Sequence, residues 1–247
     1  MVLPIAGLDN PRQVAVDKTG TIYITDGADT TRVIKLAPGA SSPTVLPFEG
    51  LRTANYVAVG IDGTVYVSDY TGNRVYQLSV GASMSKAVPL NGLLLPSGVA
   101  TDASGALYVV DTGNDRVLKL PAGSGTQTEL PFDGLFRPVG VAVDAVGAVY
   151  VTDTRNTVQR LSAGQSKSNF LPFNGLTNPT AIAVDTAGAV YVADTSNKRI
   201  VKLSPTGVQV ALPVPGLQDP DGVAVDNDGN VYVTDSKGDR LFKIPAH

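Results

Sequence analysis

The sequence of 247 residues predicts an all-β fold, in which six similar units of four short antiparallel strands close into a ring. Three observations lead to this prediction: a unit that is repeated six times, prolines that mark one strand of each unit, and chain ends that complement each other. The unit is clearest at residues 222–235, which read Gly-Val-Ala-Val-Asp-Asn-Asp-Gly-Asn-Val-Tyr-Val-Thr-Asp. A period near forty residues with strands only is typical of the blades of a six-bladed β-propeller. The tyrosine of the unit recurs at Tyr23, Tyr66, Tyr108, Tyr150, Tyr191 and Tyr232.

Each unit is predicted to contain four strands. In the sixth repeat, residues 223–225 alternate in size, as expected of a strand crowded near a central axis. The Asp-Asn-Asp-Gly that follows predicts a tight turn, because its aspartate can accept backbone N–H bonds and its glycine tolerates positive φ. Residues 231–233 and 241–244 are the second and third strands, with a second turn between them. A fourth strand is predicted in the earlier repeats, for example at residues 44–48.

A proline lies in every predicted fourth strand. Proline lacks an N–H donor, so inside sheets it is confined to edge positions. The fourth strand is therefore predicted to be the outermost of its blade. These prolines are Pro47, Pro89, Pro131, Pro172 and Pro213.

The two ends of the sequence complement each other. The sixth repeat stops after its third strand, at Ile244, and residues 2–5 (Val-Leu-Pro-Ile) have the fourth-strand pattern. We expect the N-terminal strand to complete the last blade, so that the ring is closed and its sheet edges stay short. Residues 1–247 would then form a single propeller domain.

Composition limits the function. The net charge is −3 and Lys and Arg are not clustered, so we expect no nucleic-acid partner. No run of about 18 apolar residues is present, so we expect no membrane insertion by this domain. The chain has no Cys, and its only His is His247, so thiol chemistry, a Ser–His pair and a His-bound zinc are not expected. We expect no metal, no cofactor and a monomer.

Two sets of repeated aspartates could be interpreted as carboxylate rings for calcium or as turn formers, and the second interpretation is favoured. The first aspartate precedes glycine in a turn that needs a side-chain acceptor. The second aspartate is expected to contact an arginine across the next turn in every blade, although repeat four lacks this arginine. The first set is Asp17, Asp102, Asp144, Asp185 and Asp226, with Gly60 in repeat two; the second is Asp26, Asp69, Asp111, Asp153, Asp194 and Asp235.

The repeats differ most in the connection that leads from one fourth strand over the axial mouth to the next first strand. At the second position after the recurrent proline position, four repeats carry Gly or Ala, whereas repeats one and two carry Gln13 and Tyr56; repeat six carries Asp221 one position earlier. Ring closure would place Asp221 beside Arg12, and the tyrosine would supply a stacking face. These residues predict a ligand-binding arc at the mouth; the alternative is an Arg–Asp pair that serves only solubility. The predicted arc is Arg12, Gln13, Asn55, Tyr56 and Asp221.

A second group in the same connections is apolar. It lies on adjacent blades, and adjoining exposed apolar side chains can mark a surface for a partner. The alternative is that these side chains pack locally onto the loop beneath. The group comprises Leu94, Leu95, Phe136 and Val139.

The pattern Gly-Leu-x-x-Pro-x-Gly-Val-Ala-Val-Asp, followed by Val-Tyr-Val-Thr-Asp and Asn-x-Arg-Val, resembles the NHL repeat of six-bladed propellers in all six units. The Leu-Pro-Phe-x-Gly-Leu at residues 130–135 and 171–176, with Val-x-Lys-Leu at 117–120, resembles the extracellular sensor domains of bacterial receptor serine/threonine kinases of the PknD type. This resemblance implies an extracellular or cell-surface domain without catalytic residues. It would bind a small molecule, peptide or protein at the axial mouth, while a separate kinase domain does the chemistry.

Two other functions stay open. Amidating-type lyases of related fold would require zinc held by His, and lactonase-type propellers hold a divalent cation with inner Glu, Asn and Asp. Glu49 and Glu129, the only two glutamates, are expected near the outer strand and far from the axis. We therefore expect this domain not to be an enzyme, although a bound metal would revive that alternative. The third function is a structural or engineered scaffold.

Overall fold

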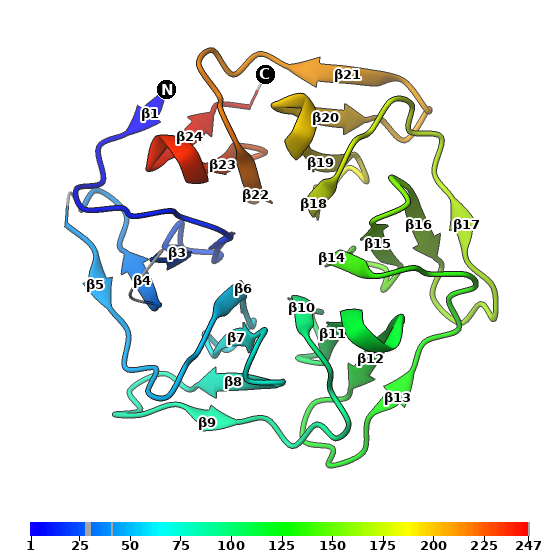
Figure 1. Cartoon of the computed structure of the whole chain (residues 1–247), viewed down its shortest axis with the longest axis horizontal. Helices are drawn as coiled ribbons and strands as arrows, with labels where there is room; N and C mark the ends of the chain where they lie inside the picture. Colours follow the sequence, from blue (N-terminus) through cyan, green and yellow to red (C-terminus); the bar gives the residue numbers. More distant parts are fainter. Residues whose placement is uncertain (28–30, 41, 247) are drawn as a thin grey trace.

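The computed structural model describes residues 1–27, 31–40 and 42–246. Within these residues the chain forms six four-stranded antiparallel sheets arranged around a central axis (Figure 1). The predicted all-β six-bladed propeller is thereby confirmed. Blade 1 runs outward from the axis through β2 (Val14–Val16), β3 (Ile22–Asp26), β4 (Arg32–Leu36) and β5 (Thr44–Val45).

The next four blades repeat this order. Blade 2 contains β6 (Ala54–Val59), β7 (Val65–Asp69), β8 (Arg74–Leu78) and β9 (Lys86–Ala87), and blade 3 contains β10 (Pro96–Thr101), β11 (Leu107–Asp111), β12 (Arg116–Leu120) and β13 (Thr128–Glu129). Blade 4 contains β14 (Pro138–Val143), β15 (Val149–Asp153), β16 (Val158–Leu161) and β17 (Asn169–Phe170), and blade 5 contains β18 (Pro179–Val184), β19 (Val190–Asp194), β20 (Arg199–Leu203) and β21 (Gln209–Leu212).

Blade 6 is completed by the N-terminal strand, as predicted. Its strands β22 (Pro220–Val225), β23 (Val231–Asp235) and β24 (Arg240–Ile244) are followed at the outer edge by β1 (Val2–Leu3). Val2 lies opposite Phe242 in the antiparallel register. The Met1 amino group donates to the Lys243 carbonyl at 2.7 Å, and the Lys243 N–H donates back to the Met1 carbonyl at 2.8 Å. Figure 1 shows β1 beside β24 where the ring closes.

The fourth strands are the outermost, as predicted, but most are shorter than expected. In blades 1 to 4 each has two residues, and the proline lies just beyond its end; β5, for example, stops at Val45 before Pro47. β21 has four residues because the turn that precedes it is shorter. The missing N–H of proline thus ends the outer ladder rather than lying within it.

Five of the six first strands start earlier than predicted and contain a bulge. In β22 the pairing with β23 shifts between Pro220 and Val223. A Cβ built on Gly222 would lie 2.7 Å from the Arg12 carbonyl oxygen of the next blade, so neighbouring first strands meet very closely at this level. This close approach explains the small residues at the bulge in most repeats.

The hydrophobic core lies between the blades. Val109 and Val151, on the second strands of blades 3 and 4, are fully buried, and each contributes to a cluster that joins two adjacent blades. Both faces of each sheet are therefore covered. Three short 3₁₀ turns, η1 (Thr112–Asn114), η2 (Thr195–Asn197) and η3 (Ser236–Gly238), follow the second strands of blades 3, 5 and 6. In the part of the chain that the structure describes, no helix is long and apolar enough to cross a membrane.

Candidate functional site

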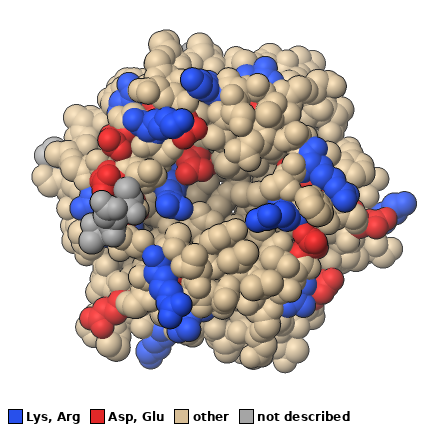
Figure 2. Space-filling model, in the orientation of Figure 1, with Lys and Arg blue, Asp and Glu red and all other residues tan. Residues whose placement is uncertain are grey.

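One face of the ring carries the connections between blades together with the turns that follow the second strands. Figure 2 shows this face hollowed at its centre, with Lys and Arg side chains around the hollow. A cavity of about 560 Å³ lies here. It takes side chains from four of the six blades, and we call it the mouth cavity. Its lining residues are Arg12, Asn55, Tyr70, Ser97, Thr112, Phe136, Arg137, Val139 and Thr154.

The predicted polar arc is assembled around the mouth, but at two levels. Arg12 and Asn55 are half-buried and line the mouth cavity. Gln13 is buried below them, and its Nε2 donates to the Asp221 carbonyl at 2.8 Å across the junction of blades 1 and 6. The expectation that ring closure brings Asp221 next to the first repeat is therefore confirmed.

Tyr56 does not offer the open stacking face that the sequence suggested. Its side chain is only 6% exposed, and its hydroxyl donates a hydrogen bond to the carbonyl of Thr180. The tyrosine therefore spans the axis from blade 2 to blade 5, which lies opposite in the ring (Figure 1). Below it, a narrower channel of about 190 Å³ runs between the first strands. At the bulge position, where most repeats carry Gly or Ala, Tyr56 thus forms a floor between the mouth and the channel.

Burial also shapes the electrostatics of the mouth. Burial raises the pKa of the Asp221 carboxyl to about 7; the nearby Arg12 charge opposes the shift and the Asp219 charge adds to it. Burial raises the pKa of the Tyr56 phenol well above 10, with a further contribution from Asp221. The tyrosine therefore stays neutral at physiological pH, while Asp221 changes charge near pH 7. Asp221 is not among the residues that line the mouth cavity.

Sequence reasoning missed the residues that the second turn contributes to the cavity. Tyr70, Thr112 and Thr154 each follow directly after the second aspartate of their repeat, and each lines the cavity. A signal was available at Tyr70, because the position after that aspartate holds Thr or Ser in four of the six repeats. Ser97 and Arg137 were also missed, although both lie next to the recurrent proline of their connection.

The four apolar residues do not form one uniform surface. Phe136 and Val139 line the mouth cavity, whereas Leu94 and Leu95 do not. Leu94 is 43% exposed and Phe136 is 44% exposed. The Leu94 carbonyl accepts the Gly113 N–H at 2.8 Å, and a Cβ on Gly113 would meet the Leu94 side chain at 2.5 Å. Leu94 thus lies against the turn beneath it, while Phe136 faces the cavity.

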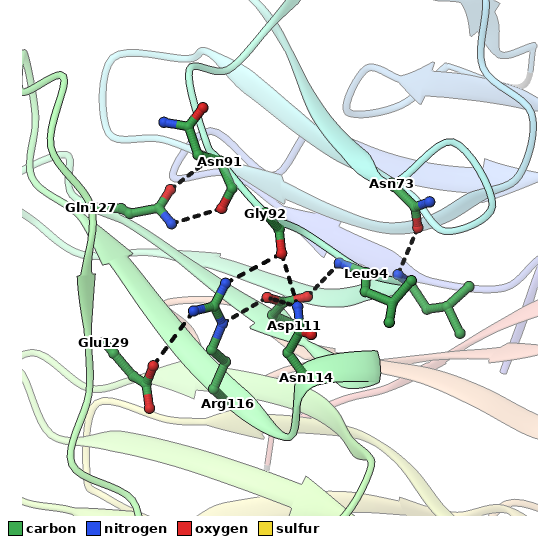
Figure 3. Close-up of polar contacts among 10 residues, drawn as sticks. Asn73, Asn91, Gly92, Leu94, Asp111, Asn114, Arg116, Gln127 and Glu129 are labelled. Carbon is green, nitrogen blue, oxygen red and sulfur yellow. Dashed lines mark hydrogen bonds and ion pairs between the residues drawn. The ribbon is translucent and has the colours of Figure 1, made fainter.

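The second aspartate of each repeat anchors the loops that carry this site. Figure 3 shows the arrangement in blade 3, where Asp111 is fully buried. One carboxylate oxygen accepts the Leu94 N–H at 2.7 Å, and the other accepts Arg116 Nε at 2.8 Å. Arg116 also donates to the Gly92 carbonyl at 3.3 Å, so aspartate and arginine together hold the connection onto its blade. Equivalent pairs are Asp26–Arg32, Asp194–Arg199 and Asp235–Arg240.

The expected Asp–Arg contact in every blade is wrong for two blades. In blade 2 Arg74 donates instead to the Gly72 carbonyl, and Asp69 Oδ2 is buried without a hydrogen-bond partner in the described residues. In blade 4 the turn is one residue shorter and lacks the arginine, so Asp153 accepts bonds from its own turn, including the Thr157 hydroxyl at 2.8 Å.

The first aspartates are turn formers, as interpreted. Asp17 Oδ1 accepts the N–H groups of Thr19 and Thr21 at 2.8 and 3.0 Å, and its other oxygen accepts the Tyr23 hydroxyl at 3.1 Å. These hydrogen bonds lower the pKa of Asp17 against the opposing effect of burial, which is the largest single contribution. Among the residues that the structure describes, no group of three or more His, Cys, Asp and Glu side chains is placed to hold a metal ion.

Blades 5 and 6 each contain a segment that matches a known repeat. Residues 176–203 and 217–244 match the NHL repeat. The chain contains NHL repeats. The matched segments cover the first three strands of blades 5 and 6, and the complete propeller has six blades. No curated protein sequence was found to match this chain.

Solved structures share the fold at low sequence identity. A catalytically inactive virginiamycin B lyase from Staphylococcus aureus with quinupristin is 14% identical, with a TM-score of 0.75 over 100% of this chain and 85% of the lyase chain. An auxiliary nutrient binding protein from Bacteroides thetaiotaomicron is 14% identical, with a TM-score of 0.77 over 96% of this chain and 69% of the other. A chain of a nidogen/laminin complex is 19% identical, with a TM-score of 0.78 over 87% and 84%. These similarities establish the fold alone.

Proposed function

We propose that this NHL propeller is a non-catalytic binding module whose ligand occupies the mouth cavity. One observation carries the proposal: a cavity of about 560 Å³ lies where the repeats differ from one another. The scaffold positions, such as Asp111 and Arg116, recur in most blades, whereas most of the cavity residues do not. Concave sites with apolar walls and a few polar groups are the usual form of a ligand pocket.

We further propose that the module is the extracellular or cell-surface sensor domain of a receptor kinase. The Leu-Pro-Phe-x-Gly-Leu segments support this setting, and a nutrient binding protein of the same fold shows that such propellers occur in binding roles. The sequence of the full gene product tests it. A transmembrane helix and a kinase domain in that product would agree with the proposal, and their absence would contradict the receptor setting while leaving the binding role untouched.

Ligand binding at the cavity is tested by screening metabolites and peptides for thermal stabilisation. A ligand at about a hundred times its Kd should stabilise the folded state by about 2.7 kcal/mol. Thr154→Trp would fill the cavity from an exposed position, and Val146→Trp, at a 74% exposed residue of the same blade that does not line the cavity, is the control. Stabilisation should be lost in the first variant and kept in the second. Equal stabilisation of both variants would place the ligand elsewhere, and no ligand in any library would favour a structural scaffold.

The apolar residues Phe136 and Leu94 favour a protein or peptide as the ligand. Phe136 borders the cavity, and Leu94 lies exposed on the adjacent blade. A bound peptide could therefore extend from the cavity over blade 3. Leu94→Ser should then weaken a peptide ligand without changing the affinity of a small molecule held inside the cavity, as measured by calorimetry. Unchanged peptide affinity would confine the binding surface to the cavity.

The second candidate function is a proton-transfer enzyme that uses Asp221. A carboxyl group with a pKa of about 7 near a cleft is suited to general acid–base catalysis, and a lyase shares the fold. Against this function, Asp221 does not line the mouth cavity. Mass spectrometry of any identified ligand after incubation distinguishes the two: unchanged ligand agrees with a binding module. Turnover that Asp221→Asn abolishes, with binding retained, would show an enzyme.

A further inference from the structure

The lining of the mouth cavity has the opposite charge to the protein as a whole. The chain has 22 acidic and 19 basic residues, for a net charge of −3. The cavity lining nevertheless contains two arginines and no aspartate or glutamate. Figure 2 shows basic side chains at the border of the hollow, with acidic side chains beside some of them. The field inside the cavity therefore favours negative charge, because low-dielectric walls focus the potential of the groups that line them.

The two cavity arginines differ from the scaffold arginines in whether they form ion pairs. Arg32, Arg116, Arg199 and Arg240 each form an ion pair with a buried aspartate. Among the ion pairs between described residues, none includes Arg12 or Arg137. The guanidinium groups of the cavity thus keep their donors available, and a guanidinium with free donors binds carboxylate or phosphate in a bidentate manner.

Two carboxylates near these arginines leave much of this charge in place. Asp115 accepts the backbone N–H of Arg137 at 2.6 Å and lies outside the cavity lining. Asp221 lies near Arg12, but burial disfavours its charged form. Near neutral pH the Arg12 charge is therefore only partly compensated.

The remaining walls favour an apolar body between the charges. Tyr70 of blade 2 and Phe136 of blade 4 line the cavity, and the Arg155 guanidinium lies 4.9 Å from the centre of the Phe136 ring. The hydroxyls of Ser97 and Thr112 lie 2.6 Å apart, and each is bonded to a carbonyl of blade 4. Because these hydroxyls are already used within the protein, the arginines are the strongest polar groups left for a ligand.

We infer that the ligand of the mouth cavity is an organic anion with an apolar or aromatic body, an inference that rests on the proposed binding function. Arg12 belongs to the start of blade 1 and Arg137 to the start of blade 4, and these blades lie on opposite sides of the axis (Figure 1). The best match is a molecule with an acidic group at each end. Aromatic rings between the two ends would contact Tyr70 and Phe136.

Calorimetry with a matched pair of probes tests the inference. Biphenyl-4,4′-dicarboxylate carries the proposed charges, and its diamide has the same shape without them. We expect the dicarboxylate to bind at least about tenfold more tightly than the diamide, since hydrogen bonds to charged groups are roughly twice as strong as neutral ones. Arg12→Gln and Arg137→Gln should each weaken the dicarboxylate about tenfold and leave the diamide unchanged.

Arg52→Gln is the matched control, because Arg52 is exposed on the same side of blade 2 and does not line the cavity. It should leave both affinities unchanged, and added salt should weaken only the dicarboxylate. If the dicarboxylate and the diamide bind with equal affinity, and Thr154→Trp abolishes the binding of both, the inference of an anionic ligand is wrong. The proposed binding function would still hold. The inference of an anionic ligand would also be wrong if the dicarboxylate does not bind at several millimolar, or if neither cavity substitution weakens its binding. The screen with Thr154→Trp then decides the binding function separately.

Discussion

Asp221→Asn should stabilise the protein at alkaline pH, since the variant removes a buried charge while keeping the shape of the side chain. Burial raises the pKa of Asp221 from an ordinary value of 3.8 to about 7 in the folded protein. Between these two values the folded state holds a proton that the unfolded state has released. The free energy of unfolding therefore falls as pH rises through this window. The stabilisation is complete below about pH 4 and is lost above about pH 7.

The magnitude follows from the size of the shift. About three pKa units, at about 1.4 kcal/mol each, correspond to a ceiling of about 4 kcal/mol. Asp221 is half-buried, and Arg12 offsets part of the desolvation, so we expect roughly 1–3 kcal/mol. Asparagine cannot ionise and resembles the protonated acid. The variant should therefore match the wild type near pH 4 and exceed its stability by this amount near pH 8.5.

Urea unfolding followed by circular dichroism at several pH values measures this difference. The comparison between wild type and variant cancels the other titrating groups, such as Asp17, whose lowered pKa makes the opposite contribution at acid pH. Asp133→Asn, at an exposed loop position of blade 3, is the control for the exchange of a carboxylate for an amide. A variant that is equally or less stable than the wild type near pH 8.5 would refute the assignment of a buried, destabilising charge to Asp221.

Three further predictions concern the scaffold. Gln159→Leu combined with Ser168→Ala should raise the free energy of unfolding by about 1 kcal/mol, because Gln159 Nε2 is buried without a partner in the described residues. Deletion of residues 1–5 should lower the free energy of unfolding by about 3 kcal/mol or more, because β1 and its half-buried side chains complete blade 6. The shortened protein should still unfold in one cooperative transition. Arg116→Met should cost about 1–3 kcal/mol, because it leaves a buried carboxylate uncompensated, whereas Arg74→Met should cost less than about 1 kcal/mol.

Denaturant unfolding measures the free energy of unfolding for all three predictions, and a different result would contradict each one. A Gln159→Leu and Ser168→Ala variant less stable than the wild type would show that the amide has a partner in solution, such as an ordered water. A protein without residues 1–5 that melts like the intact chain would show that β1 does not hold the ring closed. Equal losses for the Arg116 and Arg74 variants would mean that Arg74 reaches its buried aspartate in solution.

The sequence predicted the fold well because the repeat constrains it at many positions at once. Three features predicted the same ring: the spacing of Tyr23 and its equivalents, the prolines after the outer strands, and the pattern of residues 2–5. Strand ends were less accurate. The bulge that starts β22 at Pro220 depends on contact with the neighbouring blade, and no local pattern reports such a contact.

The candidate site was predicted only in part. Arg12 and Asn55 were found because their connection varies between repeats, and both line the cavity. The direction of Tyr56 was wrong, since a repeat pattern places a residue on a level of the ring but does not say that its hydroxyl reaches a carbonyl on the opposite blade. Tyr70 and Thr154 were missed because only one of the two loops that form the mouth was considered.

The pairing of β1 with β24 has a consequence for synthesis. The residues of β1 are synthesised before those of β24, and their backbone groups find partners only when β24 has been made. Blades 1 to 5 can form before β24 has been synthesised, but blade 6 cannot, and the two blades beside it stay partly uncovered until then. Until β24 has formed, the open ring exposes apolar blade faces, and the molecule is then most prone to aggregation.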